Sequence, residues 1–237
     1  MILVLGATGH IGSQVVQHLL ANGEKVRCVA RKFPNRAIFK DAELITGDIN
    51  EVAVIHEAMH GCKSAFVMLP TDLKAEEPRF NANKMGEVIG EAIEESGIKK
   101  IVNLSSIGAE MEDGTGPITA LHDQEVRLNS LSGVDVLHLR CTFFMENHLQ
   151  AIPSMIAMNR YFGTVDGDTP IDMVATRDIA ARVAFLLMSP NFKGHSVEYI
   201  LGPRAYSMNE TVKILGDAIE KNDIEYVEVS DDEMRNY

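Results

Sequence analysis

The sequence contains few cysteines, no excess of basic residues and no long apolar segment. Its 237 residues include three cysteines, Cys28, Cys62 and Cys141, which are far apart and form no Cys-x-x-Cys pair. Neither a disulfide framework nor a thiolate metal site is therefore expected. No apolar run approaches the roughly 20 residues of a membrane span, and no signal segment precedes the first apolar strand. These absences predict a protein of the reducing cytoplasm that has no membrane partner.

The charge balance argues against nucleic acid as a partner. Lysine and arginine total 22, aspartate and glutamate total 34, and the formal net charge is -12 at pH 7. A chain with this charge repels a phosphate backbone. A ligand that carries phosphate must therefore be held by a local group of residues, and a small molecule is the expected partner.

Short β-branched segments alternate with helical patterns, which is typical of a parallel α/β sheet. The predicted strands are residues 2–5, 26–30, 44–46, 65–69, 101–104 and 134–139. A glycine follows each intervening helix and the next strand begins soon after it, at Gly23, Gly61, Gly97 and Gly133. Short right-handed crossovers of this kind build a doubly wound, Rossmann-type sheet, whose ligand crevice lies at the carboxyl ends of the strands.

The regular alternation ends after Arg140, and this change predicts two regions. Residues 1–150 are expected to form the nucleotide-binding Rossmann domain, and residues 151–237 a smaller substrate-covering region. The second region contains a turn cluster at 163–170, a helix at about 178–188 and a strand at about 197–200. We expect the 178–188 helix to pack back on the Rossmann core.

Three glycines lie between the first predicted strand and the first amphipathic helix, in ILVLGATGHIG. A dinucleotide pyrophosphate needs a tight turn, a close backbone approach and exposed N–H groups at the positive end of a helix. Gly6, Gly9 and Gly12 can supply these three features in order. The alternative is a purely structural strand-to-helix turn. The position after the first strand and before a helix favours nucleotide binding.

The GATGHIG segment resembles the Gly-x-x-Gly-x-x-Gly motif of the atypical short-chain dehydrogenase/reductase superfamily. The segments VRCVARK, GDI, RCTFFMENHL and VATRDIA narrow the resemblance to the NmrA-like group. That group includes NADPH-dependent quinone and dye reductases and catalytically silent redox sensors. The resemblance covers essentially the whole chain. It implies a Rossmann fold, a nicotinamide dinucleotide cofactor and a substrate site beside the nicotinamide.

The residues after the second strand favour NADP(H) over NAD(H). NAD-selective sites place an acidic residue there for the ribose 2′-hydroxyl, whereas this chain has Arg31 and Lys32, which suit a 2′-phosphate. By the resemblance, Asp48 touches the adenine edge; the alternative is that Asp48 or Asn50 caps the following helix. The resemblance and the position in the crevice place further residues along the cofactor: Thr8, His10, Ile11, Ile49, Met68, Leu69, Pro70 and Ser105.

Two other patterns invite a chemical interpretation that we reject. The segment from His56 to His60 fits the His-Glu-x-x-His zinc pattern. Its helix is a short crossover element that ends at Gly61, and no third ligand is indicated, so no metal is expected. Cys141 lies at a strand end, but nothing in the sequence pairs a base with it.

The chain lacks the Tyr-x-x-x-Lys pair of classical short-chain reductases, in which a lysine assists a tyrosine that protonates the carbonyl oxygen. None of the five tyrosines is followed by lysine at the fourth position. His122 occupies the helix start where the tyrosine is expected, and Val126 replaces the lysine. Alcohol dehydrogenation driven by tyrosine is therefore not expected.

Quinones and conjugated dyes place smaller demands on the protein, because delocalisation stabilises their reduced forms. An ordinary histidine titrates near pH 6.5, at about the pH where a proton donor is needed, so His122 is the candidate donor. The alternative is a histidine that only caps or packs. By resemblance, Phe143 and Phe144 stack a flat acceptor and Asn147 orients it; the alternative is an ordinary core segment.

These patterns lead to one main hypothesis and two rivals. The main hypothesis is an NADPH-binding oxidoreductase that passes hydride to a quinone-like or other conjugated acceptor. The first rival is a non-enzymatic sensor of NADP(H) redox state that acts through a protein partner. The second, a nucleotide-sugar epimerase, requires an acid/base residue that the sequence does not reveal.

Overall fold

The computed structural model describes residues 1–70 and 75–234, which form two compact units. The first unit combines Met1–Cys141 with Thr176–Ile200. The second combines Thr142–Ala175 with the chain from Leu201 onward. The sequence places a boundary after residue 150, whereas the contacts divide the chain after Cys141. The reason is that the strand at Phe143–Phe144 pairs inside the second unit, with Met173 and Val174.

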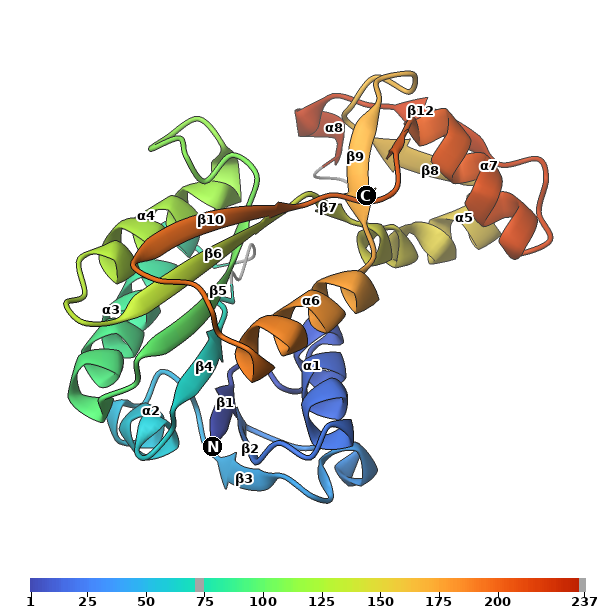
Figure 1. The fold of residues 1–237 in the computed structure, drawn as a ribbon. Coiled ribbons are helices and arrows are strands. Elements are labelled where there is room, and N and C mark those ends of the chain that lie inside the picture. Colours follow the sequence, from blue (N-terminus) through green and yellow to red (C-terminus); the bar gives the residue numbers. More distant parts are fainter. Residues whose placement is uncertain (71–74, 235–237) are drawn as a thin grey trace. The chain divides into compact units, whose positions relative to one another are not determined.

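A seven-stranded parallel sheet forms the centre of the first unit (Figure 1). Its order is β10-β6-β5-β4-β1-β2-β3. The strands are β1 (Ile2–Val4), β2 (Val26–Ala30), β3 (Glu43–Thr46), β4 (Ser64–Val67), β5 (Lys100–Ser106), β6 (Asp135–Cys141) and β10 (His195–Ile200). Each predicted strand is present, with ends that differ by a residue or two, and the predicted Rossmann-type fold is confirmed.

Helices cover both faces of this sheet. In Figure 1, α1 (His10–Ala21) and α6 (Thr176–Met188) lie on one face, and α2 (Val52–Met59), α3 (Pro78–Ser96) and α4 (Thr119–Asn129) lie on the other. Two short 3-10 helices occur in the connections, η1 (Arg36–Phe39) and η2 (Gly116–Ile118). The α6 helix packs against α1, so this late segment belongs to the Rossmann unit.

Local sequence explains where these elements form and end. The apolar positions of α1 recur at helical spacing, and Ile11, Val15, Val16 and Leu19 are all buried. The α3 helix ends where Gly97 adopts φ +75°, a left-handed conformation that residues with a Cβ rarely adopt. All three residues of β1 are fully buried, as expected for a central parallel strand.

The second unit contains two small sheets. The first joins β11 (Ala205–Tyr206), β9 (Ile171–Val174) and β7 (Phe143–Phe144), and the second joins β12 (Glu225–Glu228) to β8 (Arg160–Gly163). The remaining elements are η3 (Met145–Ala151), α5 (Ile152–Met158), α7 (Met208–Ala218) and α8 (Asp231–Met234). The core of this unit consists of Met155, Tyr161, Met173, Met208 and Val212.

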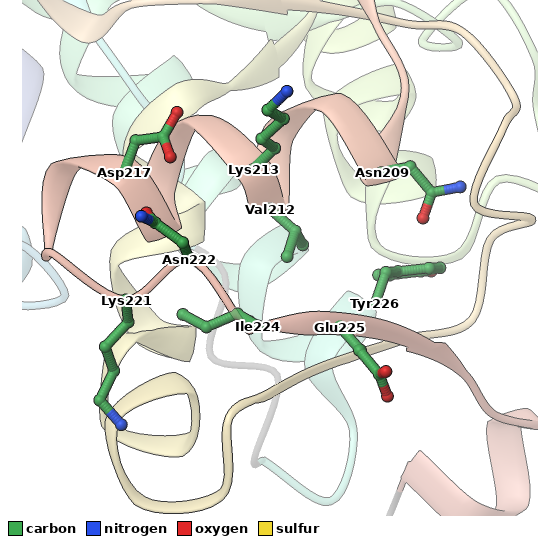
Figure 2. A pocket seen from close by; sticks show the side chains of 9 residues that line it. All are labelled: Asn209, Val212, Lys213, Asp217, Lys221, Asn222, Ile224, Glu225 and Tyr226. Carbon is green, nitrogen blue, oxygen red and sulfur yellow. The ribbon is translucent and has the colours of Figure 1, made fainter.

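An open groove of about 680 Å³ runs between α7 and β12 in the second unit (Figure 2). Val212, Ile224 and the ring of Tyr226 form its apolar part. Polar and charged side chains of both signs surround it, among them Lys213 and Glu225. Of the helices in the described ranges, none is both long and apolar enough to span a lipid bilayer.

Candidate functional site

The glycine turn after β1 is built by the main chain. Gly6 has φ +66°, and the Gly9 N–H donates to its carbonyl oxygen at 2.9 Å. Gly9 is the N-cap of α1, and among the described residues no side chain accepts from the first N–H groups of the helix as a cap. A helix start of this kind presents N–H donors and a partial positive charge to an anion.

The glycines are required by close contacts as well as by conformation. A Cβ on Gly12 would lie 2.2 Å from the carbonyl oxygen of Gly6, so only glycine allows α1 to approach the turn. A Cβ on Gly9 would lie 3.3 Å from the same oxygen, which is tight but less severe. The turn and the start of α1 therefore pack backbone against backbone, with no room for a side chain at Gly12.

A cavity of about 660 Å³ opens beside this turn at the carboxyl ends of the strands. The predicted cofactor residues that line it are Gly6, Thr8, Gly9, Arg31, Asp48, Ile49, Met68 and Pro70. Five further lining residues were not predicted: Val29, Ala30, Gly47, Asn50 and Met85. Three of these, Ala30, Gly47 and Asn50, adjoin predicted residues in the sequence, and Val29 lies two residues before Arg31. Met85 comes from α3, and no local pattern in the sequence shows that this helix reaches the cavity.

The other predicted cofactor residues do not line this cavity: His10, Ile11, Gly12, Lys32, Leu69 and Ser105. Ile11 and Leu69 are buried in the core at 7% and 5% exposure, and Gly12 packs against the turn. Lys32 and its neighbour Arg31 are both exposed, but of the two only Arg31 borders the cavity.

Asp48 forms a local turn with Asn50. Its Oδ1 accepts from the backbone N–H of Asn50 at 3.0 Å and from the side-chain amide at 2.9 Å. The alternative that Asp48 or Asn50 caps α2 is wrong, because the N-cap is Glu51. The Asp48 carboxylate is thus oriented by its own turn and borders the cavity.

Four polar side chains from β5, the loop after it, α4 and β6 bind one another, and we call them the α4 cluster: Ser105, Glu110, Glu125 and Arg140. Arg140 donates to both oxygens of Glu125, at 3.0 Å from Nε and 2.7 Å from Nη2, and to Glu110 at 3.0 Å. The Ser105 hydroxyl donates to Glu125 Oε1 at 2.5 Å. Only 11% of the Arg140 side chain and 6% of that of Glu125 are exposed. The hydrogen bonds that Arg140 donates to Glu125 raise the pKa of the guanidinium above its usual range.

His122 lies one turn before Glu125 on α4, and its Nδ1 is 2.9 Å from the carbonyl oxygen of Ala109. A carbonyl only accepts, so Nδ1 carries the proton and the neutral ring has a lone pair on Nε2. The side chain lines a separate cavity of about 610 Å³ together with Arg79, Asn83, Glu87, Glu112, Asp123, Val126 and Arg127. Among the described residues, no member of the glycine turn lines that cavity.

The residues predicted to bind substrate belong to the second unit. Phe143 and Phe144 form β7, and Asn147 lies in η3. Phe143 is 41% exposed, with its ring centroid 5.1 Å from that of His148. Asn147 is exposed.

The two rejected patterns have structural explanations. His56 Nδ1 is 3.0 Å from a carboxylate oxygen of Glu95 on α3, while His60 is exposed. Within the described ranges, no group of three histidine, cysteine or acidic side chains is arranged to hold a metal ion. Burial raises the pKa of the Cys141 thiol to about 12, so this group is protonated and is not a nucleophile at neutral pH.

Comparison with known proteins points to one family. The model of the NmrA-like family matches residues 1–236. A (4-alkanoyl-5-oxo-2,5-dihydrofuran-3-yl)methyl phosphate reductase from Streptomyces griseus is 28% identical over 215 residues, which are 89% of this chain and 71% of that protein. The NAD(P)H azoreductase of Xenophilus azovorans is 25% identical over 229 residues, 92% of this chain and 73% of that protein.

Solved structures establish the same fold. The triphenylmethane reductase of Citrobacter sp., complexed with NADP(H), has a TM-score of 0.83 and 18% identity, covering 99% of this chain and 81% of that chain. An NADPH-dependent quinone oxidoreductase from Escherichia coli, complexed with NADPH, has a TM-score of 0.79 and 21% identity, covering 97% and 79%. At this level of identity the likeness concerns the fold.

Proposed function

The chain belongs to the NmrA-like family, and from this premise we propose that it is an NADP(H)-dependent oxidoreductase that reduces a quinone-like or other conjugated acceptor. The observation that carries the proposal is the cavity beside the glycine turn, where predicted cofactor residues from four separate loops meet. The azoreductase relative supports a conjugated acceptor, since its sequence aligns with 92% of this chain.

The residues present fit a phosphorylated dinucleotide. The amides at the start of α1 suit the pyrophosphate, and the absence of a side chain on Gly12 lets this helix start pack directly against the turn that borders the cavity. Arg31 suits the 2′-phosphate, because a guanidinium binds phosphate through two parallel hydrogen bonds. When bound, the nicotinamide supplies a hydride equivalent.

The acceptor's reduced oxygen or nitrogen needs a proton, and His122 is the proposed donor, although its cavity and the cavity beside the glycine turn have no lining residue in common among those described. Because Ala109 holds Nδ1–H, only Nε2 is free to exchange a proton with a ligand. His122 therefore donates from its imidazolium form and retains the Nδ1–H bond throughout. Val126 cannot supply the positive charge of the missing lysine, so the acceptor must stabilise much of its own developing charge.

The test is NADPH absorbance over time with purified protein and a panel of quinones, azo dyes and triarylmethane dyes, with NADH as control. Acceptor-dependent loss of NADPH supports the reductase. Binding of NADPH without consumption by any acceptor contradicts it and supports the redox sensor.

Replacing His122 with Phe tests the donor directly. Turnover should fall on the order of 100-fold, the usual scale of general acid catalysis, while the Kd for NADPH stays the same. An unchanged rate assigns His122 a packing role and leaves the reductase proposal intact.

A further inference from the structure

The loop between β5 and α4 is fastened to the sheet at several points. The Ile107 N–H donates to the carbonyl of Cys141 at 3.0 Å, directly after Arg140 in β6. The Ala109 N–H donates to Ser106 at 3.1 Å, and Ala109 is only 1% exposed. The position of the Ala109 carbonyl is therefore set by the loop's attachments to β5 and β6.

The side chain of Glu110 provides a further attachment of this loop to the sheet. Its Oε2 accepts from Arg140 Nη1 at 3.0 Å and from the backbone N–H of Gly108 at 3.2 Å. Arg140 cannot move freely, because Glu125 holds it through two hydrogen bonds and the Tyr199 hydroxyl accepts from it at 3.0 Å. A half-exposed carboxylate is thus fixed by a buried guanidinium.

These hydrogen bonds connect α4 to β6, β6 to the loop between β5 and α4, and this loop back to α4. Glu125 binds Arg140 in β6, Arg140 binds Glu110 in the loop, and the carbonyl of the neighbouring Ala109 accepts from His122. His122 and Glu125 are three residues apart, so they lie on the same face of the helix. Displacing Glu110 should therefore displace the acceptor of the His122 proton.

We propose that Glu110 and Arg140 are positioning residues that hold the Ala109 carbonyl against His122 and so select its Nδ1–H tautomer. A neutral imidazole carries its proton on either nitrogen, and the hydrogen bond of one nitrogen decides which is protonated. The charged groups that share the His122 cavity are Arg79, Glu87, Glu112, Asp123 and Arg127. Among the described residues, none of these groups is hydrogen bonded to the imidazole of His122. The hydrogen bonds that Arg79 donates to Asp123 lower the pKa of that carboxyl group, so Asp123 stays an acceptor.

The experiment reads the tautomer by ¹⁵N–¹H correlation of the histidine rings in the full chain, at alkaline pH and without cofactor. The chain has eight histidines, and the signal that disappears in His122→Phe identifies His122. The unmodified protein should show Nδ1–H. Glu110→Ala should shift the ratio of the two neutral tautomers roughly tenfold toward Nε2–H, the scale of one lost hydrogen bond. Glu110→Gln, which keeps an acceptor oxygen, should restore most of the original ratio.

Glu112→Ala is the matched control. Glu112 is an exposed carboxylate on the same loop, and its contact with Arg79 uses the backbone carbonyl, so the ratio should not change. A neutral His122 that carries Nε2–H in the unmodified protein overturns the proposal. An unchanged ratio in Glu110→Ala, or an equal shift in Glu112→Ala, also overturns it.

The catalytic consequence rests on the proposed function, and the two fail separately. With an acceptor that is turned over, Glu110→Ala should lower kcat and leave the Kd for NADPH unchanged. If the tautomer responds as expected but no acceptor is reduced, the positioning role stands and the reductase proposal fails. If acceptors are reduced but the tautomer of Glu110→Ala is unchanged, the reductase stands and the positioning role fails.

Discussion

The two polar regions at the carboxyl end of the central sheet differ in what their groups bind. Around the glycine turn, backbone amides and Arg31 border a cavity, and within the described ranges no other side chain forms a hydrogen bond or ion pair with Arg31. In the α4 cluster, each side chain is hydrogen bonded to another member. Free donors can bind a ligand, whereas donors and acceptors that satisfy one another hold the structure in one arrangement.

The largest effect should follow from breaking the buried pair of the α4 cluster. Arg140→Met leaves the Glu125 carboxylate, 6% exposed, without its cation, and should cost about 3–5 kcal/mol of unfolding free energy. Urea denaturation measures this loss. Arg182→Met is the control, because the Arg182–Glu198 pair is 39% and 30% exposed and should contribute about 1 kcal/mol or less. Equal losses in both variants contradict the distinction between the two pairs.

His138, a buried residue of β6 that contacts Asn129 of α4, should make the unfolding free energy depend on pH. His138 is 1% exposed and is hydrogen bonded to Asn103 and Asn129. Burial lowers its pKa to about 4, below the value of about 6.5 in the unfolded chain. The contribution of His138 to the unfolding free energy is fully present above pH ~6.5. It is lost as the pH falls toward 4, by about 3 kcal/mol in total.

The measurement is the unfolding free energy between pH 7 and about 4, the window of this histidine. His138→Leu should lower stability at pH 7 but remove this part of the pH dependence. His60→Gln changes an exposed histidine at the end of α2 and should leave the dependence unaltered. Parallel curves for His138→Leu and the unmodified protein contradict the assignment.

At the glycine turn, the sensitive groups are backbone atoms. Gly12→Ala would place a methyl group 2.2 Å from the Gly6 carbonyl oxygen, and overpacking of this kind costs about 1–3 kcal/mol. The same shift should reduce NADPH affinity, since the turn itself borders the cavity. Gly9→Ala has a clearance of 3.3 Å and should cost less stability. Thermal unfolding and NADPH titration of the two variants measure the difference; a larger stability loss in Gly9→Ala contradicts it.

The sequence predicts the glycine-turn region better than the α4 cluster, and the reason is physical. The turn depends on residues close in sequence, with a strand, three glycines and a helix in succession, so its pattern is visible locally. Arg140 meets Glu125 and Glu110 only because β5 and β6 pair in register and α4 lies above them. Charged residues at those positions look like an ordinary solvated surface in the sequence.

The same reasoning explains what was missed elsewhere. Met85 reaches the cavity from α3, and its contact depends on how that helix packs on the sheet. His122 is on the predicted helix, but its cavity is formed with α3 through Arg79 and Asn83, which the sequence cannot show. The division of the chain after Cys141 depends on the two-residue strand β7, which is too short to produce a pattern.

A further difference is expected between two neighbouring basic residues. Arg31 borders the cavity and Lys32 does not, although the sequence gives both the same role. Arg31→Glu should remove a charge-assisted contact of about 1.5–3 kcal/mol, which raises the Kd for NADPH roughly 10- to 100-fold. The Kd for NADH should change far less, because NADH lacks the 2′-phosphate. Titration calorimetry with both cofactors measures these constants.

Lys32→Glu is the matched control for this experiment, since it makes the same charge reversal one residue away. Both substitutions change the long-range field of the protein equally, and salt screens that field over about 10 Å at 0.1 M. Any excess loss in Arg31→Glu therefore comes from contact. An equal loss of NADPH and NADH in Arg31→Glu refutes the 2′-phosphate assignment. An equal loss of NADPH in both variants reduces the preference to general electrostatic attraction, and the cavity would then select the dinucleotide through its backbone alone.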